Sequence, residues 1–250
     1  MKEWSSAGAK IQGNQHKKKN IPCQDAFKLI EKDNFFCSAV SDGAGSSKYP
    51  EIASEIVVNR ITKILEESFD SFFTAPKNET KEKIIHRIRT KLGIEAKNKK
   101  ATINDFNSTL LFVAIKNKNY IVGHIGDGAI GYLVENNLKT FSEPLNGEYK
   151  NQTYFLTTKG YKNHFRIYKG ELKNISGFIL ATDGTTDSLY NYETNKFAEI
   201  GIKIIKWLDE NDKEKVNEAI KENLLNVISK KTGDDCTLLI MRKIKAANNV

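Results

Sequence analysis

Four short apolar stretches of this sequence lead into, or follow, an aspartate that stands beside or close to a glycine. They are FFCSAVSDGAGSSKYPEIASEIV (35–57), YIVGHIGDGAIG (120–131), GFILATDGTTDSL (177–189) and KKTGDDCTLLIM (230–241). A carboxylate at the mouth of a buried strand is costly unless a charge or hydrogen bonds compensate it. One strand end of this kind would indicate a turn, whereas four of them need a common explanation.

Length and composition predict one folded unit. With 250 residues, of which 39% are hydrophobic, the chain is long enough to bury a full core. It contains 4 prolines and no stretch rich in Pro, or in Gly and Ser, that would mark a linker. We therefore expect a single domain over residues 1–250.

The excess of basic residues does not by itself indicate a nucleic-acid partner. The net charge of +8 arises from 39 basic and 31 acidic residues, and the lysines are scattered apart from brief clusters such as residues 17–19. Scattered lysines suit solubility as well as they suit an anionic partner. No nucleic-acid-binding module, such as aromatics interleaved with basic residues on a strand, accompanies them. The pattern disfavours nucleic acid as a partner.

The cysteines and the N-terminal residues argue against several other classes. Cys23, Cys37 and Cys236 show neither CxxC nor Cys/His ligand spacing, and no Cys-x₅-Arg phosphate loop. We expect each to be a small buried residue. The opening MKEWSSAGAK lacks the apolar core of a signal peptide, and no run approaches the roughly 18 apolar residues of a membrane span. We expect a cytoplasmic protein with no membrane partner.

Hydrophobic periodicity predicts both strands and helices. Runs rich in β-branched and aromatic residues predict strands at 26–30, 35–41, 109–115, 119–125, 129–134, 176–182 and 236–242. Helical spacing predicts helices at 51–69, 81–96, 197–210 and 213–230. Because the helices come in pairs and do not follow every strand, the order indicates an α+β layered fold with mainly antiparallel sheets.

This fold suggests a physical reason for the four aspartates. Strand ends that gather at one edge of a sheet would bring their carboxylates together, and the glycines would allow tight turns or close approach of a ligand. Such a cluster repels itself unless divalent cations neutralise it, and Mg²⁺ and Mn²⁺ prefer carboxylate, carbonyl and water oxygens. The alternative is that each Asp caps a helix or sits in a turn. That alternative is the better one for any single motif, but it does not explain why four strands share the device.

An ordered series of motifs resembles the metal-dependent protein phosphatases of the PP2C type, in their bacterial branch. The motifs are GNQHKKKNIPCQDAF (13–27), AVSDGAGSS (39–47), NSTLLFVAI (107–115), GHIGDGAIGYL (123–133), LATDGTTDSL (180–189) and GDDCTLLI (233–240). The resemblance implies a four-layer α-β-β-α sandwich, with two central, mainly antiparallel sheets flanked by helices. It also implies a metal site at one edge.

The resemblance assigns a role to each aspartate. Asp42 matches the catalytic carboxylate that bridges two metals, and the carbonyl of Gly43 matches a further ligand. Asp183 and Asp234 match the remaining carboxylates of the first metal. Asp127 matches the acidic position of a third, weaker metal, which shares Asp183.

Three further acidic positions lie near this set. Asp25, in the QDA that replaces the usual Glu-Asp pair, is expected in or just outside the metal shell. Asp187 is expected to orient the loop of Asp183, and Asp235 stands where Asn is often found. We expect Asp235 to lie beyond the direct ligands.

Three departures from the family pattern affect the substrate side. His16 stands where many members have an arginine that holds the substrate phosphate, and we expect it to bind phosphate or to act as a general acid. A surface histidine without a role is the alternative. Ala44 stands where many eukaryotic members have His. The segment 143–170 lacks usual landmarks, and in it Tyr149, Tyr154 and Phe155 either line a substrate groove or pack on the core.

The resemblance implies a phosphoprotein phosphatase that hydrolyses phosphoserine and phosphothreonine with two divalent cations, Mn²⁺ or Mg²⁺, and a third at the weaker site. The cations would activate a water for in-line attack on phosphorus. The expected partners are a phosphorylated protein substrate and a cognate Ser/Thr kinase. Two alternatives stay open: a catalytically weak or inactive PP2C-like regulatory module that binds phosphoprotein, and a metal-dependent nuclease or nucleotide phosphohydrolase.

Overall fold

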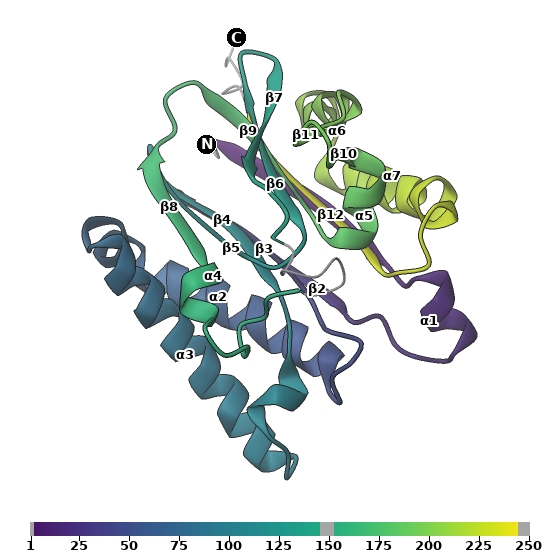
Figure 1. Ribbon diagram of the computed structural model, residues 1–250. Helices are drawn as coiled ribbons and strands as arrows, with labels where there is room; N and C mark the ends of the chain where they lie inside the picture. The colour runs from purple at the N-terminus through teal and green to yellow at the C-terminus, as the bar shows by residue number, and fades with distance from the viewer. Residues whose placement is uncertain (1–2, 146–152, 245–250) are drawn as a thin grey trace.

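Two five-stranded antiparallel sheets lie face to face at the centre of the molecule (Figure 1). The computed structural model describes residues 3–145 and 153–244. The first sheet has the order β1 (Trp4–Ile11), β12 (Cys236–Lys243), β9 (Ile175–Ala181), β6 (Ala129–Val134) and β7 (Asn137–Ser142). The second has the order β2 (Asp25–Lys32), β3 (Phe35–Asp42), β4 (Leu110–Lys116), β5 (Asn119–Ile125) and β8 (Arg166–Glu171).

Pairs of helices cover the two outer faces of the sheets (Figure 1). Helices α2 (Pro50–Thr74) and α3 (Lys77–Asn98) pack on the second sheet, whereas α6 (Ile200–Glu210) and α7 (Lys213–Asn226) pack on the first. The shorter elements are α1 (Asn14–Lys18), α4 (Tyr161–His164), α5 (Asp183–Leu189), the hairpin β10 (Tyr190–Asn191) and β11 (Lys196–Phe197), and the 3-10 turns Ile103–Phe106 and Ile228–Lys230. The predicted four-layer α-β-β-α sandwich is confirmed.

Three hydrophobic cores separate the four layers. One lies between α2, α3 and the second sheet, one between the two sheets, and one between the first sheet and α6 and α7. A strand covered on both faces must be apolar throughout. The run LLFVAI in β4 therefore has no polar alternation, because Phe112 faces the helices while Val113 faces the other sheet.

The sequence predicted the long elements better than the peripheral ones. All seven predicted strands and all four predicted helices are present, but α6 begins at Ile200 instead of residue 197, and α7 ends at Asn226 before a 3-10 turn. Strands β1, β7 and β8 and the short β10 and β11 were not predicted. In β1, WSSAGAKI carries small side chains such as Ala7 and Ala9, which are buried but give a weak hydrophobic signal. Its pairing with β12, from Trp4 with Lys243 to Ile11 with Cys236, places it in the sheet.

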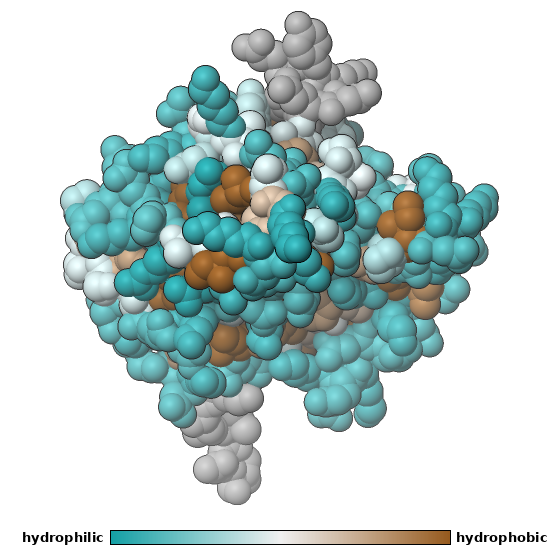
Figure 2. All heavy atoms as spheres, turned by 90° about the horizontal axis from the view of Figure 1, so that it is seen from below, coloured by the Kyte–Doolittle hydropathy of each residue, from teal (hydrophilic) through white to brown (hydrophobic). Residues whose placement is uncertain are grey.

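The surface seen from the α3 side is predominantly hydrophilic, and its hydrophobic residues form separate small patches (Figure 2). Within residues 3–145 and 153–244, no helix combines the length and the apolar composition that crossing a membrane requires. Cys37 and Cys236 are buried as predicted, whereas Cys23 is only half-buried, and all three thiols are free. Burial raises the pKa of the Cys23 thiol to about 12, which leaves it a poor nucleophile.

Candidate metal centre

The ends of β3 and β9, the β5–β6 turn and the start of β12 meet at one edge of the sandwich. Oxygen atoms of Asp42, Asp127 and Asp183 lie within 4.8 Å of one another. Asp42 is the last residue of β3, Asp183 opens α5 directly after β9, and Asp127 lies in the turn between β5 and β6. Antiparallel neighbours bring alternate strand ends to the same edge, so topology gathers residues that are up to 141 positions apart in the sequence.

The backbone around Asp42 is fixed on both sides. Its N–H donates to Oγ1 of Thr109 over 2.9 Å, and its carbonyl accepts from the N–H of Thr109 over 2.8 Å. Gly43 follows, and a Cβ at this position would lie 2.2 Å from the carbonyl oxygen of Pro50, the first residue of α2. Only glycine fits against this helix terminus. The bridge between Gly43 and Ser108 is made by hydrogen bonds of the flanking residues, so the Gly43 carbonyl is not one of its acceptors.

Asp25 lies opposite Asp42 in the pairing of β2 with β3 and is 1% exposed. Its Oδ2 accepts hydrogen bonds from the hydroxyls of Thr182 (2.9 Å) and Thr237 (2.7 Å). Its Oδ1 is buried without a hydrogen-bond partner among the described residues. Burial, with the charge of Asp235 as a further cause, raises the pKa of Asp25 to about 7, although the two threonine hydroxyls oppose the shift.

The carboxyl groups of Asp42 and Asp183 both have raised pKa values. Burial raises the pKa of Asp42 well above its usual range, and the charges of Asp183, Asp25, Asp127 and Asp234 add to the effect. The pKa of Asp183 is likewise well raised, first by burial and then by Asp127 and Asp234. Carboxylates that repel one another in this way are stabilised in their charged form by a cation placed between them.

Asp127 is supported from two directions. Its Oδ2 accepts a hydrogen bond from the hydroxyl of Thr153, while its Oδ1 is buried without a partner among the described residues. Burial raises its pKa. Below the turn, the buried His124 donates from Nε2 to the carbonyl of Gly126 (3.1 Å), while its Nδ1 lies 2.9 Å from Nη2 of Arg166. Since the guanidinium can only donate, Nδ1 accepts, and burial beside this positive charge lowers the pKa of His124.

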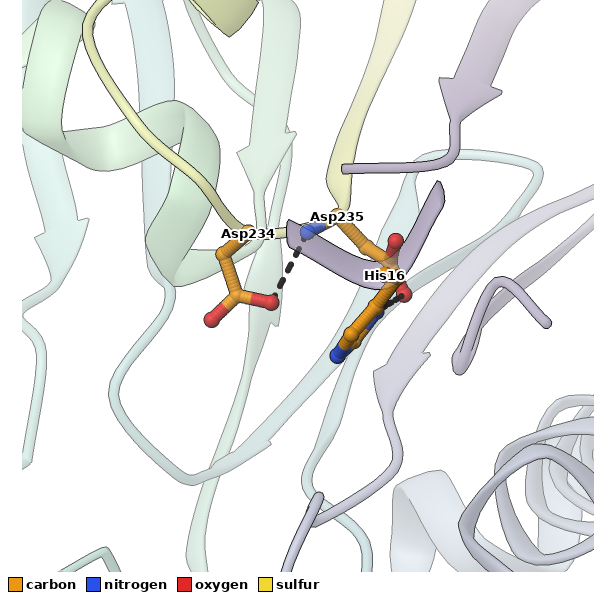
Figure 3. Close-up of side chains that lie close together, drawn as sticks. All are labelled: His16, Asp234 and Asp235. Carbon is orange, nitrogen blue, oxygen red and sulfur yellow. Dashed lines mark hydrogen bonds and ion pairs between the residues drawn. The ribbon is translucent and has the colours of Figure 1, made fainter. Parts of the chain in front are cut away.

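Asp234 and Asp235 point in different directions from the loop before β12 (Figure 3). Asp234 is exposed, and its Oδ1 accepts from the N–H of Asp235 over 2.8 Å. Asp235 is 1% exposed and accepts from the N–H groups of Gly13 and Gln24, each over 2.6 Å. Its Oδ2 also lies 3.0 Å from Nδ1 of His16, on α1.

Asp235 thus ties together segments that the sequence separates. The backbone N–H groups of Gly13 and Gln24 donate to one carboxylate, and Nδ1 of His16 lies 3.0 Å from it. Gln15 donates its N–H to the carbonyl of Gly233 over 3.0 Å. An amide side chain has only one acceptor oxygen, so an Asn here would leave one of the two backbone N–H groups facing an NH₂ group. A carboxylate at 235 therefore suits this chain better than the Asn often found there.

The arrangement fits divalent cations. Two buried oxygens, Oδ1 of Asp25 and Oδ1 of Asp127, lack hydrogen-bond partners among the described residues, and a buried polar atom is normally satisfied. The donor set consists of carboxylates, which Mg²⁺ and Mn²⁺ prefer. Local roles coexist with this one, since Oδ1 of Asp183 accepts from the N–H of Gly184 over 2.7 Å. Such a turn bond explains one carboxylate oxygen and not the gathering of several side chains.

The remaining predicted residues have different surroundings. Asp187 is exposed on α5, and burial together with the charge of Asp234 raises its pKa. Tyr154 stacks on the ring of His164 with centroids 3.4 Å apart and packs against the helix-side core, which favours the packing interpretation over a substrate groove. Phe155 is half-buried, and Tyr149 falls outside the described residues.

The sequence interpretation assigned no role to several residues that support the centre. The hydroxyls of Thr182 and Thr237, His124 beneath the Asp127 turn, and Tyr192 beside α5 were not singled out. For the threonines a signal was present, because each stands next to a quoted motif aspartate or strand start. For Tyr192 no motif signal exists.

Comparison with known proteins agrees with this geometry. Residues 12–225 match the family model described as Protein phosphatase 2C. The chain belongs to this family. Serine/threonine-protein phosphatase 3 of Escherichia coli is 24% identical to it over 188 residues, which are 72% of this chain and 73% of that protein.

Solved structures of bacterial serine/threonine phosphatases share the fold. Serine/threonine phosphatase Stp1 from Staphylococcus aureus matches with a TM-score of 0.65 at 14% identity, over 97% of this chain and 95% of that one. The serine/threonine phosphatase of S. agalactiae matches with a TM-score of 0.61 at 16% identity, over 96% of this chain and 99% of that one. The layers described above are thus shared with these two phosphatase structures.

Proposed function

We propose that this chain is a protein serine/threonine phosphatase of the PP2C family that depends on divalent cations. The observation that carries the proposal is the group formed by Asp42, Asp127 and Asp183, whose oxygens lie within 4.8 Å of one another. Family membership over residues 12–225 supplies the reaction class. We further propose that residues 1–250 form a single phosphatase domain.

The ligands follow from the positions of the side chains. Asp42 is central, because its oxygens lie within 4.8 Å of those of Asp127 and Asp183 while Asp25 lies opposite it in the β2–β3 pairing, and it would serve two cations. Asp183 and Asp234 would complete one site, while Asp25, which lies opposite Asp42 in the β2–β3 pairing, and the Gly43 carbonyl would serve the other. Asp127, with Asp183, would hold a third and weaker cation. Mn²⁺ and Mg²⁺ both suit these oxygen ligands.

The chain's own groups divide the work around the phosphoryl group. When bound, the cations lower the pKa of a water and offset negative charge in the in-line transfer. The carboxylates fix the positions of those charges, and the hydroxyls of Thr182 and Thr237 hold Asp25 in one orientation. Free thiols are not required, which agrees with the raised pKa of Cys23 and Cys236, each about 12.

His16 is proposed to contact the substrate phosphate. Asp235 lies against Nδ1 of its ring, so Nε2 is the nitrogen left for a ligand (Figure 3). A protonated ring would donate from Nε2 to a phosphate oxygen or to the leaving oxygen. The imidazole side chain is 16% exposed, which leaves it accessible from solvent.

Phosphate release from a phosphothreonine peptide tests the proposal. Release with Mn²⁺ should be abolished by EDTA and should fall by about 10³-fold or more in Asp42→Asn, because both proposed cation sites share this carboxylate. Asp33→Asn makes the same carboxyl-to-amide change at an exposed position and serves as the matched control. Release that survives both EDTA and Asp42→Asn would overturn the proposal.

The same assay separates the alternative functions. A regulatory module would bind the phosphopeptide without releasing phosphate, and a nuclease would degrade nucleic acid with Mn²⁺. The family match does not favour either. The proposed partners are a phosphorylated protein and a cognate serine/threonine kinase in the cytoplasm.

A further inference from the structure

An exposed aromatic side chain stands at the rim of the carboxylate centre. Tyr192 follows β10 at the tip of the β10–β11 hairpin and is 46% exposed. Its ring packs edge-on against Tyr190, with centroids 5.3 Å apart and an interplanar angle of 80°. The side-chain oxygen of Asn191 accepts from the N–H groups of residues 193 and 194, each over 2.9 Å. Tyr192 is therefore held by a tied hairpin although it faces solvent.

A short chain of hydrogen bonds connects Tyr192 with the centre. Its hydroxyl lies 2.8 Å from Oγ1 of Thr186, and Thr186 in turn donates to the backbone carbonyl of Asp183 over 2.9 Å. Figure 1 shows β10 directly beside α5, the helix that Asp183 opens. The pKa of the phenol is raised by burial and by the charges of Asp187, Asp183 and Asp127, which agrees with this position.

The direction of these hydrogen bonds decides which part of Tyr192 is available. Threonine has one hydroxyl proton, and Thr186 gives it to the carbonyl of Asp183. The phenol must then donate its own proton to Thr186. The phenol proton is thus committed and the oxygen can only accept, so a ligand that offers apolar surface would contact the exposed ring. Exposed aromatic rings beside a reaction centre provide rigid contact area at low entropic cost.

We propose that the ring of Tyr192 contacts the segment of a phosphoprotein substrate that flanks the phosphorylated residue, and so contributes to substrate specificity. This inference rests on the proposed phosphatase function. In this proposal the ring of Tyr192 contacts the peptide that flanks the phosphorylated residue and does not contact the phosphoryl group.

Two substrates separate the ring contact from the chemistry. One is a phosphothreonine heptapeptide, and the other is phosphothreonine capped with acetyl and methylamide groups, which lacks flanking residues. We expect Tyr192→Ala to raise KM for the heptapeptide about three- to ten-fold with little change in kcat, and to leave the capped amino acid unaffected. Tyr192→Phe, which keeps the ring, should resemble the wild type on both substrates.

Control variants keep the test decisive. Ile94→Ala removes an apolar side chain of similar exposure, 48%, from the outer helix α3 and should change neither KM. Tyr192→Leu retains apolar bulk and replaces Tyr192→Ala if thermal unfolding shows that the alanine variant is not folded.

Three outcomes would overturn the inference. Equal losses on both substrates would show that Tyr192 acts on the centre through Thr186. A loss in Tyr192→Phe as large as in Tyr192→Ala would assign the effect to the hydroxyl. Unchanged heptapeptide kinetics in Tyr192→Ala and Tyr192→Leu would remove the contact altogether. Failure of the wild type to release phosphate from either substrate would instead contradict the proposed function.

Discussion

Replacing Asp25 with Asn should stabilise the cation-free protein at alkaline pH. Burial raises the pKa of Asp25 from 3.8 to about 7, so its charged form is disfavoured in the folded state. The pKa of Asp25 is higher in the folded than in the unfolded state. Its contribution to the free energy of unfolding is therefore fully present below pH 3.8 and is lost as the pH rises through about 7. A difference of about three pKa units corresponds to about 4 kcal/mol of unfolding free energy.

Asparagine removes this loss without removing the local hydrogen bonds. Its amide oxygen can accept from the hydroxyls of Thr182 and Thr237 as Oδ2 of Asp25 does, and the amide carries no charge at any pH in this range. In EDTA at pH 8, we expect Asp25→Asn to be more stable than the wild type by up to about 4 kcal/mol, and at pH 4 by less than about 1 kcal/mol.

Urea unfolding of both proteins in EDTA at pH 4 and pH 8 measures the difference directly. Asp33→Asn, at an exposed position, should show no comparable pH-dependent gain. With saturating Mn²⁺ at pH 8, the wild type should gain more stability than Asp25→Asn, because the variant has lost a carboxylate ligand. A variant that is equal to or less stable than the wild type at pH 8 in EDTA would refute the argument that burial of this charge is uncompensated.

Three more expectations concern the surroundings of the centre. Asp235→Asn and His16→Ala should each raise KM for a phosphopeptide, and their effects should be less than additive, since Asp235 lies 3.0 Å from Nδ1 of His16 and holds the N–H of Gly13 before its helix; additive losses in a double-mutant cycle would contradict this. Gly43→Ala should lower the free energy of unfolding measured with urea by about 1–3 kcal/mol, because its Cβ would lie 2.2 Å from the carbonyl oxygen of Pro50. Mn²⁺ should raise the Tm more at pH 8 than at pH 5, where protons compete for the carboxylates; an equal shift would be inconsistent with the raised pKa values of Asp42 and Asp183.

The strand ends carried most of what the sequence could reveal about the site. Asp42, Asp127 and Asp183 each follow an apolar run, and a strand end is a local property that periodicity detects. Their meeting at one edge depends on strand order, which periodicity does not encode. The resemblance to the family supplied that order.

Contacts between segments far apart in the chain could not be predicted from the sequence. Asp235 could be placed beyond the direct ligands, but its bonds to Gly13 and Gln24 join positions 222 and 211 residues away. Strand β1 was missed for a related reason, because its small buried residues become recognisable only once β12 lies beside it. Tyr192 has an ordinary sequence context, and only the hairpin fold brings it to the rim.

The link between the two ends of the chain has a consequence for biosynthesis. Thr237 hydrogen-bonds Asp25 across 212 residues, and β12 completes the sheet beside β1. Contacts of such long sequence separation form late, because the loop must close before they contribute. On the ribosome, the second sheet with α2 and α3 can assemble from residues 25–171, whereas the first sheet and the carboxylate centre must wait for residues 234–243. The nascent chain would therefore lack the complete carboxylate centre until β12 has left the ribosome.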